Sequence, residues 1–314
     1  MLYLIITSLL WSFSFGLIKS EVSAFHPILV SLIRLSLAFL FFVPWLRKTD
    51  PTRYPKLLAI GFIQFGMMYC LYISAYSYLT GHEIAVLTVT TPIFVVLLSK
   101  AIERDTRPSD WIAAILGLLG GVAMVWPRIT QEDLAPALLG VVLIQVANLC
   151  FAAGQILYRH WNKNQAHGDH QSFAWLYLGA LLAPLAYLIA GQVIDLPMMN
   201  REIQLPTSTK TWLALLYLGI IPSGLGFYLW NKGSKLVKTG ELAVINNLKI
   251  PMAVVVAFAV ALLDLTFAKL APTPLDTPNR CTVRTRPRCP KRCILVLKQY
   301  LYVLLPRKRT KKLP

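Results

Sequence analysis

Acidic residues are scarce in this chain. Asp and Glu supply only 14 of its 314 residues, and all charged types together make up 14% of the chain, against 56% for the hydrophobic types. A water-soluble domain of this length needs far more charge on its surface. The composition therefore excludes a soluble globular protein and indicates a membrane protein.

Several motifs of enzyme and metal chemistry are also missing. The chain has no Walker A loop, no HExxH pattern and no GxSxG pattern. ATP coupling, zinc peptidase chemistry and serine hydrolase chemistry within this chain are therefore unsupported. Its five cysteines match no standard zinc spacing. We expect neither a metal site nor a cofactor.

Apolar residues occur in blocks of the length that crosses a membrane as a helix. About 20 residues span the ~30 Å hydrocarbon core. Nine such blocks lie at residues 2–18, 28–46, 57–79, 83–102, 110–127, 134–158, 172–194, 211–230 and 240–263. They show no period-2 alternation, so an outer-membrane barrel is not expected. The predicted fold is an all-α polytopic membrane protein in the lipid bilayer.

The net charge of +17 is concentrated at one end of the chain. Residues 264–314 hold 13 of the 31 Lys and Arg and 2 of the 14 Asp and Glu, a balance of +11 that leaves +6 for the preceding 263 residues. A balance of +6 is ordinary for a membrane protein with basic cytoplasmic loops. We therefore expect no nucleic-acid partner.

Basic residues in the loops orient the spans. The loop after the second span carries Arg47, Lys48, Arg53 and Lys56, and the loops after the fourth, sixth and eighth spans are also basic. The loop after the third span has no Lys or Arg. Because basic loops stay in the cytoplasm, we expect a cytoplasmic N-terminus and a place in the plasma membrane, in bacteria the inner membrane.

Part of the sequence is written twice. The tract Tyr69–Pro92 returns, degraded, as Phe227–Pro251. A shift of 158 positions aligns Gly61 with Gly219, Gly66 with Gly224, Ala85 with Ala243 and Val86 with Val244. The loop of the first copy is free of Lys and Arg, whereas that of the second carries three lysines, so the copies have opposite orientations. Two halves of an inverted repeat can swap conformations and open a central site to each side in turn.

These features resemble the drug/metabolite transporter superfamily, specifically its ten-helix proteins with two EamA-type halves. The likeness covers residues 1–263 and rests on Leu10–Phe15, Arg34, Ala75–Pro92, Gly117–Val122 and Gly240–Pro251. It implies an inverted 5+5 transmembrane helix repeat around a central cavity, and metabolite transport with export favoured over import. The related small multidrug transporters use a glutamate inside helix 1. No carboxylate occurs there in this chain, so a cation/proton antiporter of that type is disfavoured.

Two repeats and a tail divide the chain. We predict a first EamA-type repeat at 1–127, a second, incomplete one at 134–263, and a basic, proline-rich tail at 264–314. The family's tenth helix is not evident in the tail, where the apolar run Cys293–Leu305 has only 13 residues and contains Lys298. Two interpretations stay open: a frameshifted or replaced end, and a lineage-specific disordered tail.

Two cations lie inside predicted spans. Arg34 falls in the second span and Lys249 near the middle of the ninth, while no acidic residue lies deep in any span. An ionisable residue in a span costs about 2.5–3.5 kcal/mol on insertion scales and is a functional-site hypothesis by default. Asn246 and Asn247 add an amide patch beside Lys249. Fixed positive charge favours anionic or zwitterionic substrates. The alternative for Arg34 is snorkelling to the interface or pairing with carbonyls. The same alternative applies to Lys249, although a lysine in the middle of a span has further to reach water.

Other polar and aromatic residues complete the candidate site. They are Trp11, Tyr69, Tyr72, Tyr76, Asn148 and Gln155. The three tyrosines fall at i, i+3 and i+7 and predict one aromatic stripe, which is either a cavity wall or helix packing. The two amides either bond a ligand or join helices.

The leading hypothesis is a secondary transporter of small molecules such as amino acids or carboxylates. It works by alternating access, with Lys249 and Arg34 neutralising the substrate's carboxylate. One alternative is a membrane-embedded transferase, which needs an interfacial carboxylate–histidine pair for acid–base work. Another is an inactive, truncated relic of a transporter. Whether the protein forms a homodimer is left open.

Overall fold

The protein is seen in a computed structural model that describes residues 1–46, 51–104, 107–112, 115–116, 119, 134–162, 169–190 and 203–270. Residues Met1–Met252 form one compact unit, and a second unit begins at Ala253. Most of the predicted fifth span, 110–127, lies outside the described residues, as does the tail from residue 271 onward.

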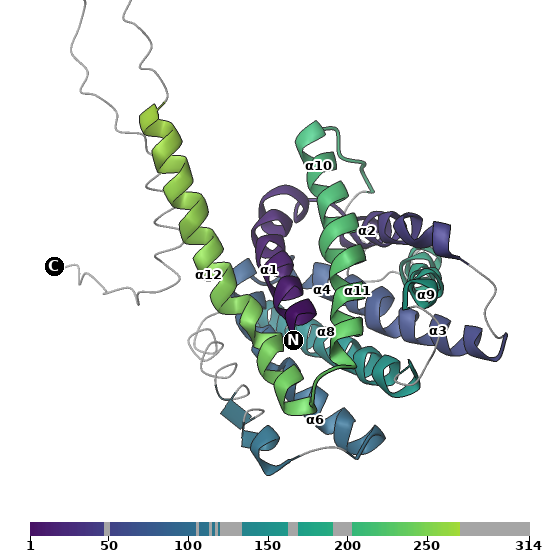
Figure 1. Ribbon diagram of the computed structural model, residues 1–314. Coiled ribbons are helices and arrows are strands. Elements are labelled where there is room, and N and C mark those ends of the chain that lie inside the picture. Colours follow the sequence, from purple (N-terminus) through teal and green to yellow (C-terminus); the bar gives the residue numbers. More distant parts are fainter. Residues whose placement is uncertain are drawn as a thin grey trace, which may run out of the picture. The chain divides into compact units, whose positions relative to one another are not determined.

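All regular elements in the described ranges are helices (Figure 1). In the first half they are α1 (Leu2–Leu17), η1 (Ile18–Val22), α2 (Pro27–Phe42), η2 (Val43–Trp45), η3 (Pro51–Arg53), α3 (Tyr54–Gly61), η4 (Phe62–Met67), α4 (Met68–Ala75), α5 (Gly81–Leu87), η5 (Thr88–Thr90) and α6 (Thr91–Ile102). In the second half they are α8 (Leu134–Asn162), α9 (Asp169–Ala190), α10 (Thr209–Leu218), η6 (Gly219–Gly226), α11 (Phe227–Ser234) and α12 (Thr239–Leu270).

Seven helical stretches are long and apolar enough to cross a membrane, and they coincide with seven of the nine predicted spans. They are Leu2–Val22, Pro27–Trp45, Tyr54–Ala75, Glu83–Ile102, Pro136–Asn162, Asp169–Ala190 and Thr209–Ser234. The predicted ninth span forms most of α12, which continues to Leu270 instead of ending at 263. The prediction of an all-α polytopic fold is confirmed.

Local sequence signals set the starts of the helices. Pro27 opens α2, where a missing backbone N–H costs nothing. Thr80 and Glu83 form a capping box at α5, with the backbone N–H of Thr80 donating to Glu83 Oε2 over 2.8 Å. This box begins the helix that follows the predicted loop without basic residues.

Two π-helical segments interrupt equivalent helices of the two repeats. η4 follows α3, and η6 follows α10. The shift of 158 positions that aligns Gly61 with Gly219 and Gly66 with Gly224 also superimposes these segments in sequence. π-helical turns inside α-helices occur frequently at functional sites.

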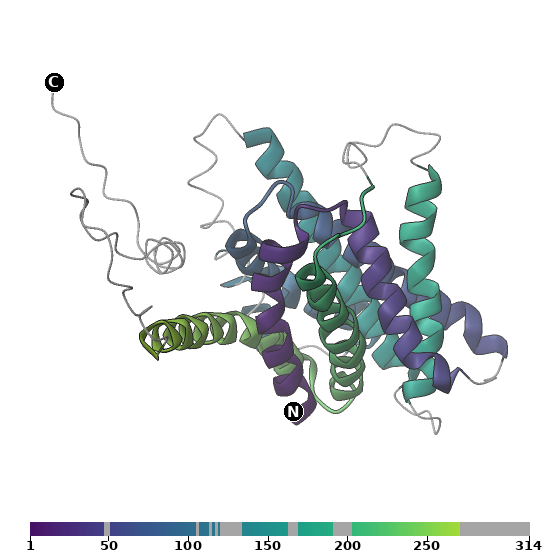
Figure 2. The ribbon, with the colours of Figure 1, turned by 90° about the horizontal axis from the view of Figure 1, so that it is seen from above.

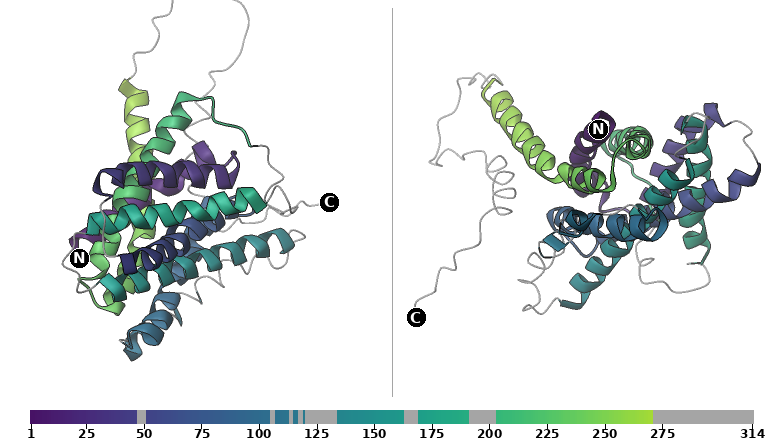
Figure 3. Two further views of the ribbon diagram at one scale, coloured as in Figure 1. Left: turned by 90° about the vertical axis from the view of Figure 1, so that its right-hand side faces the viewer. Right: turned by 60° about the horizontal axis from the view of Figure 1, so that its bottom comes forward.

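Each π-interrupted helix packs against a helix of the other repeat. A Cβ atom on Gly61 would lie 1.8 Å from the carbonyl oxygen of Leu176 in α9, and one on Gly219 would lie 2.7 Å from Cβ of Leu37 in α2. Only a residue without a side chain permits the first approach. Figure 3 shows α2, α9, α3 and α8 side by side, so helices of the two repeats alternate.

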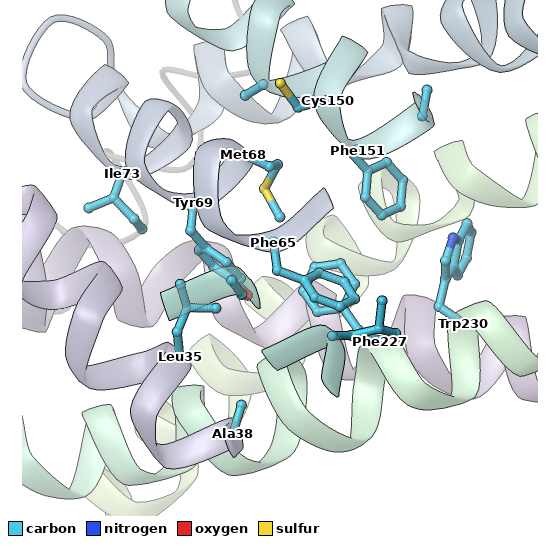
Figure 4. Packing of buried hydrophobic residues seen from close by; sticks show 14 of the residues in the cluster. Leu35, Ala38, Phe65, Met68, Tyr69, Ile73, Cys150, Phe151, Phe227 and Trp230 are labelled. Atoms are coloured by element: carbon cyan, nitrogen blue, oxygen red, sulfur yellow. The ribbon is translucent and has the colours of Figure 1, made fainter. Parts of the chain in front are cut away.

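Aromatic side chains fill the interior between these helices. Phe65 stacks on Tyr177 with ring centroids 5.0 Å apart, and it meets Phe227 at 4.9 Å. Figure 4 shows Phe65 and Phe227 beside Phe151 and Trp230. The core thus draws on η4, α8, α9 and α11 and joins the two repeats.

Ion pairs hold helix ends together. Arg159 of α8 pairs with Glu103 at the end of α6, and it also donates to Thr239 Oγ1 at the start of α12 over 2.9 Å. Lys235 after α11 pairs with Asp169, the first residue of α9. These pairs lie in the loops that the charge pattern assigns to the cytoplasm.

Candidate functional site

Lys249 is buried on the N-terminal half of α12. Its side chain is 7% exposed, and its ammonium nitrogen lies 5.6 Å from the centre of the Trp11 ring in α1. Among the described residues, no carboxylate pairs with this ammonium group. A cation over an indole face is attracted by the ring quadrupole, but this contact leaves the positive charge uncompensated.

Trp11 belongs to an aromatic cluster from three helices. Its ring centroid lies 4.9 Å from that of Trp230, 5.0 Å from that of Phe227 and 5.9 Å from that of Phe151. The indole N–H donates to the carbonyl oxygen of Pro222 over 3.0 Å. α1 packs along α11 in the same region (Figures 1 and 2). These contacts place the Trp11 ring next to the Lys249 ammonium group.

The two predicted asparagines beside Lys249 differ in their contacts. Asn246 is 1% exposed, and both its Oδ1 and its Nδ2 lack a hydrogen-bond partner. Asn247 Nδ2 donates to the carbonyl oxygen of Val89 over 3.3 Å. Asn246 lies three residues before Lys249 and thus on the same side of the helix.

The bond between Asn247 and Val89 joins equivalent positions of the two repeats, because the residues are 158 positions apart. A contact between equivalent positions of a two-fold pair lies at the two-fold axis. In an inverted repeat that axis runs within the membrane plane, and substrate sites of such transporters lie near the midplane at the repeat interface. Asn246 and Lys249 are therefore close to that axis.

Helix breaks accompany this crossing. The 3₁₀ turn η5, which contains Val89, separates α5 from α6. Asn148 Nδ2 donates to the carbonyl oxygen of Leu87 and to Thr90 Oγ1, both over 3.1 Å, and Gln145 Oε1 accepts a bond from Thr90. Asn148 is a predicted substrate-binding residue, but its amide N–H groups bond to the helix break and stabilise it.

Gln155 is tied to the aromatic cluster. Its Oε1 accepts a bond from Trp230 Nε1 over 2.9 Å, while its Nε2 has no partner. The side chain is fully buried. Gln155 therefore has one donor group left for a ligand.

Arg34 lies in a separate buried network. It is 1% exposed, and its Nη2 donates to Tyr69 Oη over 3.1 Å and to Ser223 Oγ over 3.0 Å. Its guanidinium carbon lies 4.5 Å from the Tyr69 ring centre, and its Nε and Nη1 lack partners. Tyr177 also donates to the carbonyl oxygen of Ser223. The network joins α2 and α4 to η6, so Arg34 does not snorkel to the interface.

The predicted tyrosine stripe divides in two. Tyr69 bonds to Arg34 and Ser223, whereas the hydroxyls of Tyr72 and Tyr76 lie 3.2 Å from each other. Sequence reasoning did not identify Ser223 or Asn231. Ser223 is a polar residue inside the predicted span 211–230, a signal that would have found it, whereas Asn231 lies one residue beyond that span and only the longer helical stretch Thr209–Ser234 includes it.

The sequence matches the EamA-like transporter family over residues 1–126 and 138–271. The chain belongs to this family. The family match and its relatives indicate a transporter, so the predicted alternative of a membrane-embedded transferase is wrong. This EamA-type chain is a multi-pass membrane protein that transports small metabolites.

Several curated relatives share most of its length. The biotin transporter of Salmonella typhimurium is 34% identical over 83% of this chain and 84% of its own. The biotin transporter of Escherichia coli strain K12 is 32% identical with the same coverage. The probable biotin transporter of Pseudomonas aeruginosa is 34% identical over 80% of this chain and 86% of its own. A solved crystal structure at 18% identity covers 96% of this chain and 94% of its own with a TM-score of 0.60, which supports the fold.

Proposed function

We propose that this EamA-type transporter carries a small carboxylate across the membrane, and that biotin is that carboxylate. The observation that carries the proposal is the buried ammonium group of Lys249, which has no carboxylate partner in the described part of the chain. A substrate carboxylate would neutralise it in a site of low dielectric constant, where one ion pair is worth far more than in water.

Relatives and site chemistry support biotin over an amino acid. Relatives of 32–34% identity are named biotin transporters, and biotin carries one carboxylate and no ammonium group. An amino acid would also bring an ammonium group. The two buried residues of the predicted site that carry charge, Arg34 and Lys249, are both cations. A net positive site favours a substrate of net negative charge.

Trp11 has a supporting role in this proposal. Its ring faces the Lys249 ammonium and is fixed by the bond to Pro222, so it limits where the charged end of the lysine lies. The repeat interface beside Asn247 and Val89 is where alternating access would expose the site to each side. The proposed substrate-binding residues are Lys249, Asn246, Asn247, Trp11 and Gln155. The other residues predicted for the site bond to other protein groups and are proposed to hold the surrounding helices: Asn148, Arg34, Tyr69, Tyr72 and Tyr76.

The test is transport of labelled biotin by the purified full-length chain in proteoliposomes. We expect Lys249→Gln to reduce flux at least about tenfold, because the carboxylate loses its counter-ion. Lys56→Gln is the matched control, since Lys56 also lies over an indole, 5.5 Å from the ring centre of Trp161, but at a helix end. If proteoliposomes that contain the wild-type protein move no biotin, the proposal is refuted.

Direction follows from the same preparation. Alternating access is reversible, so vesicles loaded with biotin and vesicles exposed to external biotin report efflux and influx separately. The family resemblance predicts export as the net direction. If biotin enters the vesicles faster than it leaves them under an imposed proton gradient, the predicted direction is wrong, while the proposed substrate still stands.

A further inference from the structure

Asn246 differs from the other buried amide side chains that the structure describes. Gln64 and Asn231 bond to each other, Asn148 bonds to Leu87 and Thr90, and Asn162 bonds to Tyr158 and Arg53. Gln155 keeps one bond, through its Oε1, although its Nε2 has no partner. In Asn246 both the donor and the acceptor are buried without a partner. A buried polar group left unpaired destabilises the folded state. An amide kept in this condition therefore indicates a ligand that pairs with it.

The surroundings of Asn246 point the same way. Lys249 lies one turn further on the same side of α12, and α12 is fixed to α1 by the bond from Ser8 Oγ to the carbonyl oxygen of Ile245, 3.4 Å long. Trp11, one turn after Ser8, lies under the Lys249 ammonium. An amide, an ammonium group and an indole thus gather where α1 meets α12.

A carboxylate alone does not satisfy this group of side chains. Carboxylate oxygens accept hydrogen bonds and donate none, so a carboxylate could pair with Lys249 and with Asn246 Nδ2 but would leave Oδ1 unpaired. Oδ1 needs a donor and Nδ2 an acceptor. A cyclic urea or a cis amide presents an N–H and a C=O side by side, and this edge matches the edge of an asparagine amide.

We propose that Asn246 determines specificity by pairing with a ureido or cis-amide edge of the substrate, while Lys249 holds the carboxylate at the other end. The proposal rests on the proposed function and adds to it a second recognition point. The ureido ring of biotin carries this edge. Carboxylates of similar size without such an edge would leave Asn246 unpaired and be rejected.

The test compares three ligands in proteoliposomes. Biotin has both groups, biotin methyl ester lacks the carboxylate, and lipoate has a ring and a carboxylate but no ureido group. We expect the wild type to prefer biotin over lipoate by at least about 100-fold in KM, because sites built for hydrogen bonds reject analogues that lack them. In Asn246→Leu this preference should fall below about tenfold. Lys249→Gln should keep it but lose the preference for biotin over its methyl ester.

Folding is measured on the same variants. Leucine has nearly the shape of asparagine without its polar atoms, so we expect the thermal midpoint of Asn246→Leu to equal or exceed that of the wild type. A structural amide would give the opposite result, a lower midpoint with unchanged ligand preference. Asn162→Leu is the control for loss of a buried asparagine, and it should keep the wild-type preference.

Each remaining outcome has one meaning. Unchanged preference for biotin over lipoate in Asn246→Leu overturns the inference even if biotin is transported. If the wild type moves no biotin, the proposed function is refuted. Binding of the cyclic urea desthiobiotin then tests the role of Asn246 separately. Desthiobiotin binding that Asn246→Leu loses would uphold the ureido site, whereas absent or unchanged binding would overturn it.

Discussion

Gln64 and Asn231 exchange two hydrogen bonds across the boundary between the repeats. Gln64 Nε2 donates to Asn231 Oδ1 over 2.8 Å, and Asn231 Nδ2 donates to Gln64 Oε1 over 3.1 Å. Both side chains are fully buried, one in η4 and the other in α11. The reciprocal pair fixes the π-helical segment of the first repeat against the second repeat.

Removing one member of this pair should cost more than removing both. Gln64→Leu or Asn231→Leu leaves the other amide buried and unpaired, which should lower the free energy of unfolding by about 1–3 kcal/mol. The double variant removes both polar groups and should recover most of that loss. Unfolding of the wild type, the two single variants and the double variant in detergent micelles gives the coupling energy of the pair. If the stability losses of the single variants add up in the double variant, the two residues are not coupled.

This pair also shows what the sequence predicts and what it does not. Polar residues are rare within apolar spans, so Lys249, Asn246 and Arg34 stand out without any structure. Partners, however, depend on which helices meet. Gln64 is separated from Asn231 by 167 positions, and nothing in either span specifies that contact.

The tyrosines illustrate the same limit. Helical periodicity placed Tyr69, Tyr72 and Tyr76 on one stripe, but a stripe wide enough for three rings faces more than one neighbouring helix. Tyr69 meets Arg34, whereas Tyr72 meets Tyr76. The sequence does not predict the π-helical segments, although Gly61 and Gly219 of the aligned pairs lie where the two segments begin, and Gly66 and Gly224 lie within them.

Two of the glycines that the repeat aligns, Gly61 of the first copy and Gly224 of the second, should respond unequally to alanine. A Cβ on Gly61 would lie 1.8 Å from the carbonyl oxygen of Leu176, whereas the nearest atom to a Cβ on Gly224 is 3.4 Å away. Gly61→Ala forces backbones apart, so we expect a loss of at least about 1–3 kcal/mol, the usual cost of overpacking. Gly224→Ala is the matched control and should change stability by less than about 1 kcal/mol. Thermal unfolding of both variants in one detergent makes the comparison, and equal losses would contradict it.

Loss of the ion pair between Arg159 and Glu103 should destabilise the protein more than loss of the ion pair between Lys210 and Glu21. Their side chains are 5% and 12% exposed, so Glu103→Gln leaves a buried guanidinium without its counter-charge and should destabilise the protein by about 3–5 kcal/mol. The pair of Lys210 and Glu21 is the control, because Lys210 is 78% exposed. Glu21→Gln should change stability by no more than about 1 kcal/mol. Chemical unfolding measures the stability of both variants. Equal losses of stability would show that the Arg159 guanidinium reaches water once its counter-charge is removed.

Arg34 should act on the framework more than on the substrate. One of its nitrogens bonds to both Tyr69 and Ser223, and a lysine ammonium cannot reproduce the planar fork. We expect Arg34→Lys to lower the free energy of unfolding by about 1–3 kcal/mol and to change the KM for biotin by less than about threefold. A KM increase of tenfold or more at unchanged stability would instead assign its free Nε and Nη1 to the substrate, as the sequence first suggested.

The inverted repeat makes a prediction about sidedness. Ser77 and Leu236 lie in equivalent loops, Ser77 after α4 and Leu236 after α11, and both are exposed. The loop charges place the first outside and the second in the cytoplasm. In a chain whose Cys281, Cys289 and Cys293 are replaced by serine, Ser77→Cys should react with a membrane-impermeant maleimide on intact cells, and Leu236→Cys only after permeabilisation. The native Cys70 and Cys150 are buried and should remain unlabelled. Labelling of both introduced cysteines on intact cells would mean that the two copies share one orientation, and a two-fold axis through Val89 and Asn247 could not then lie in the membrane plane.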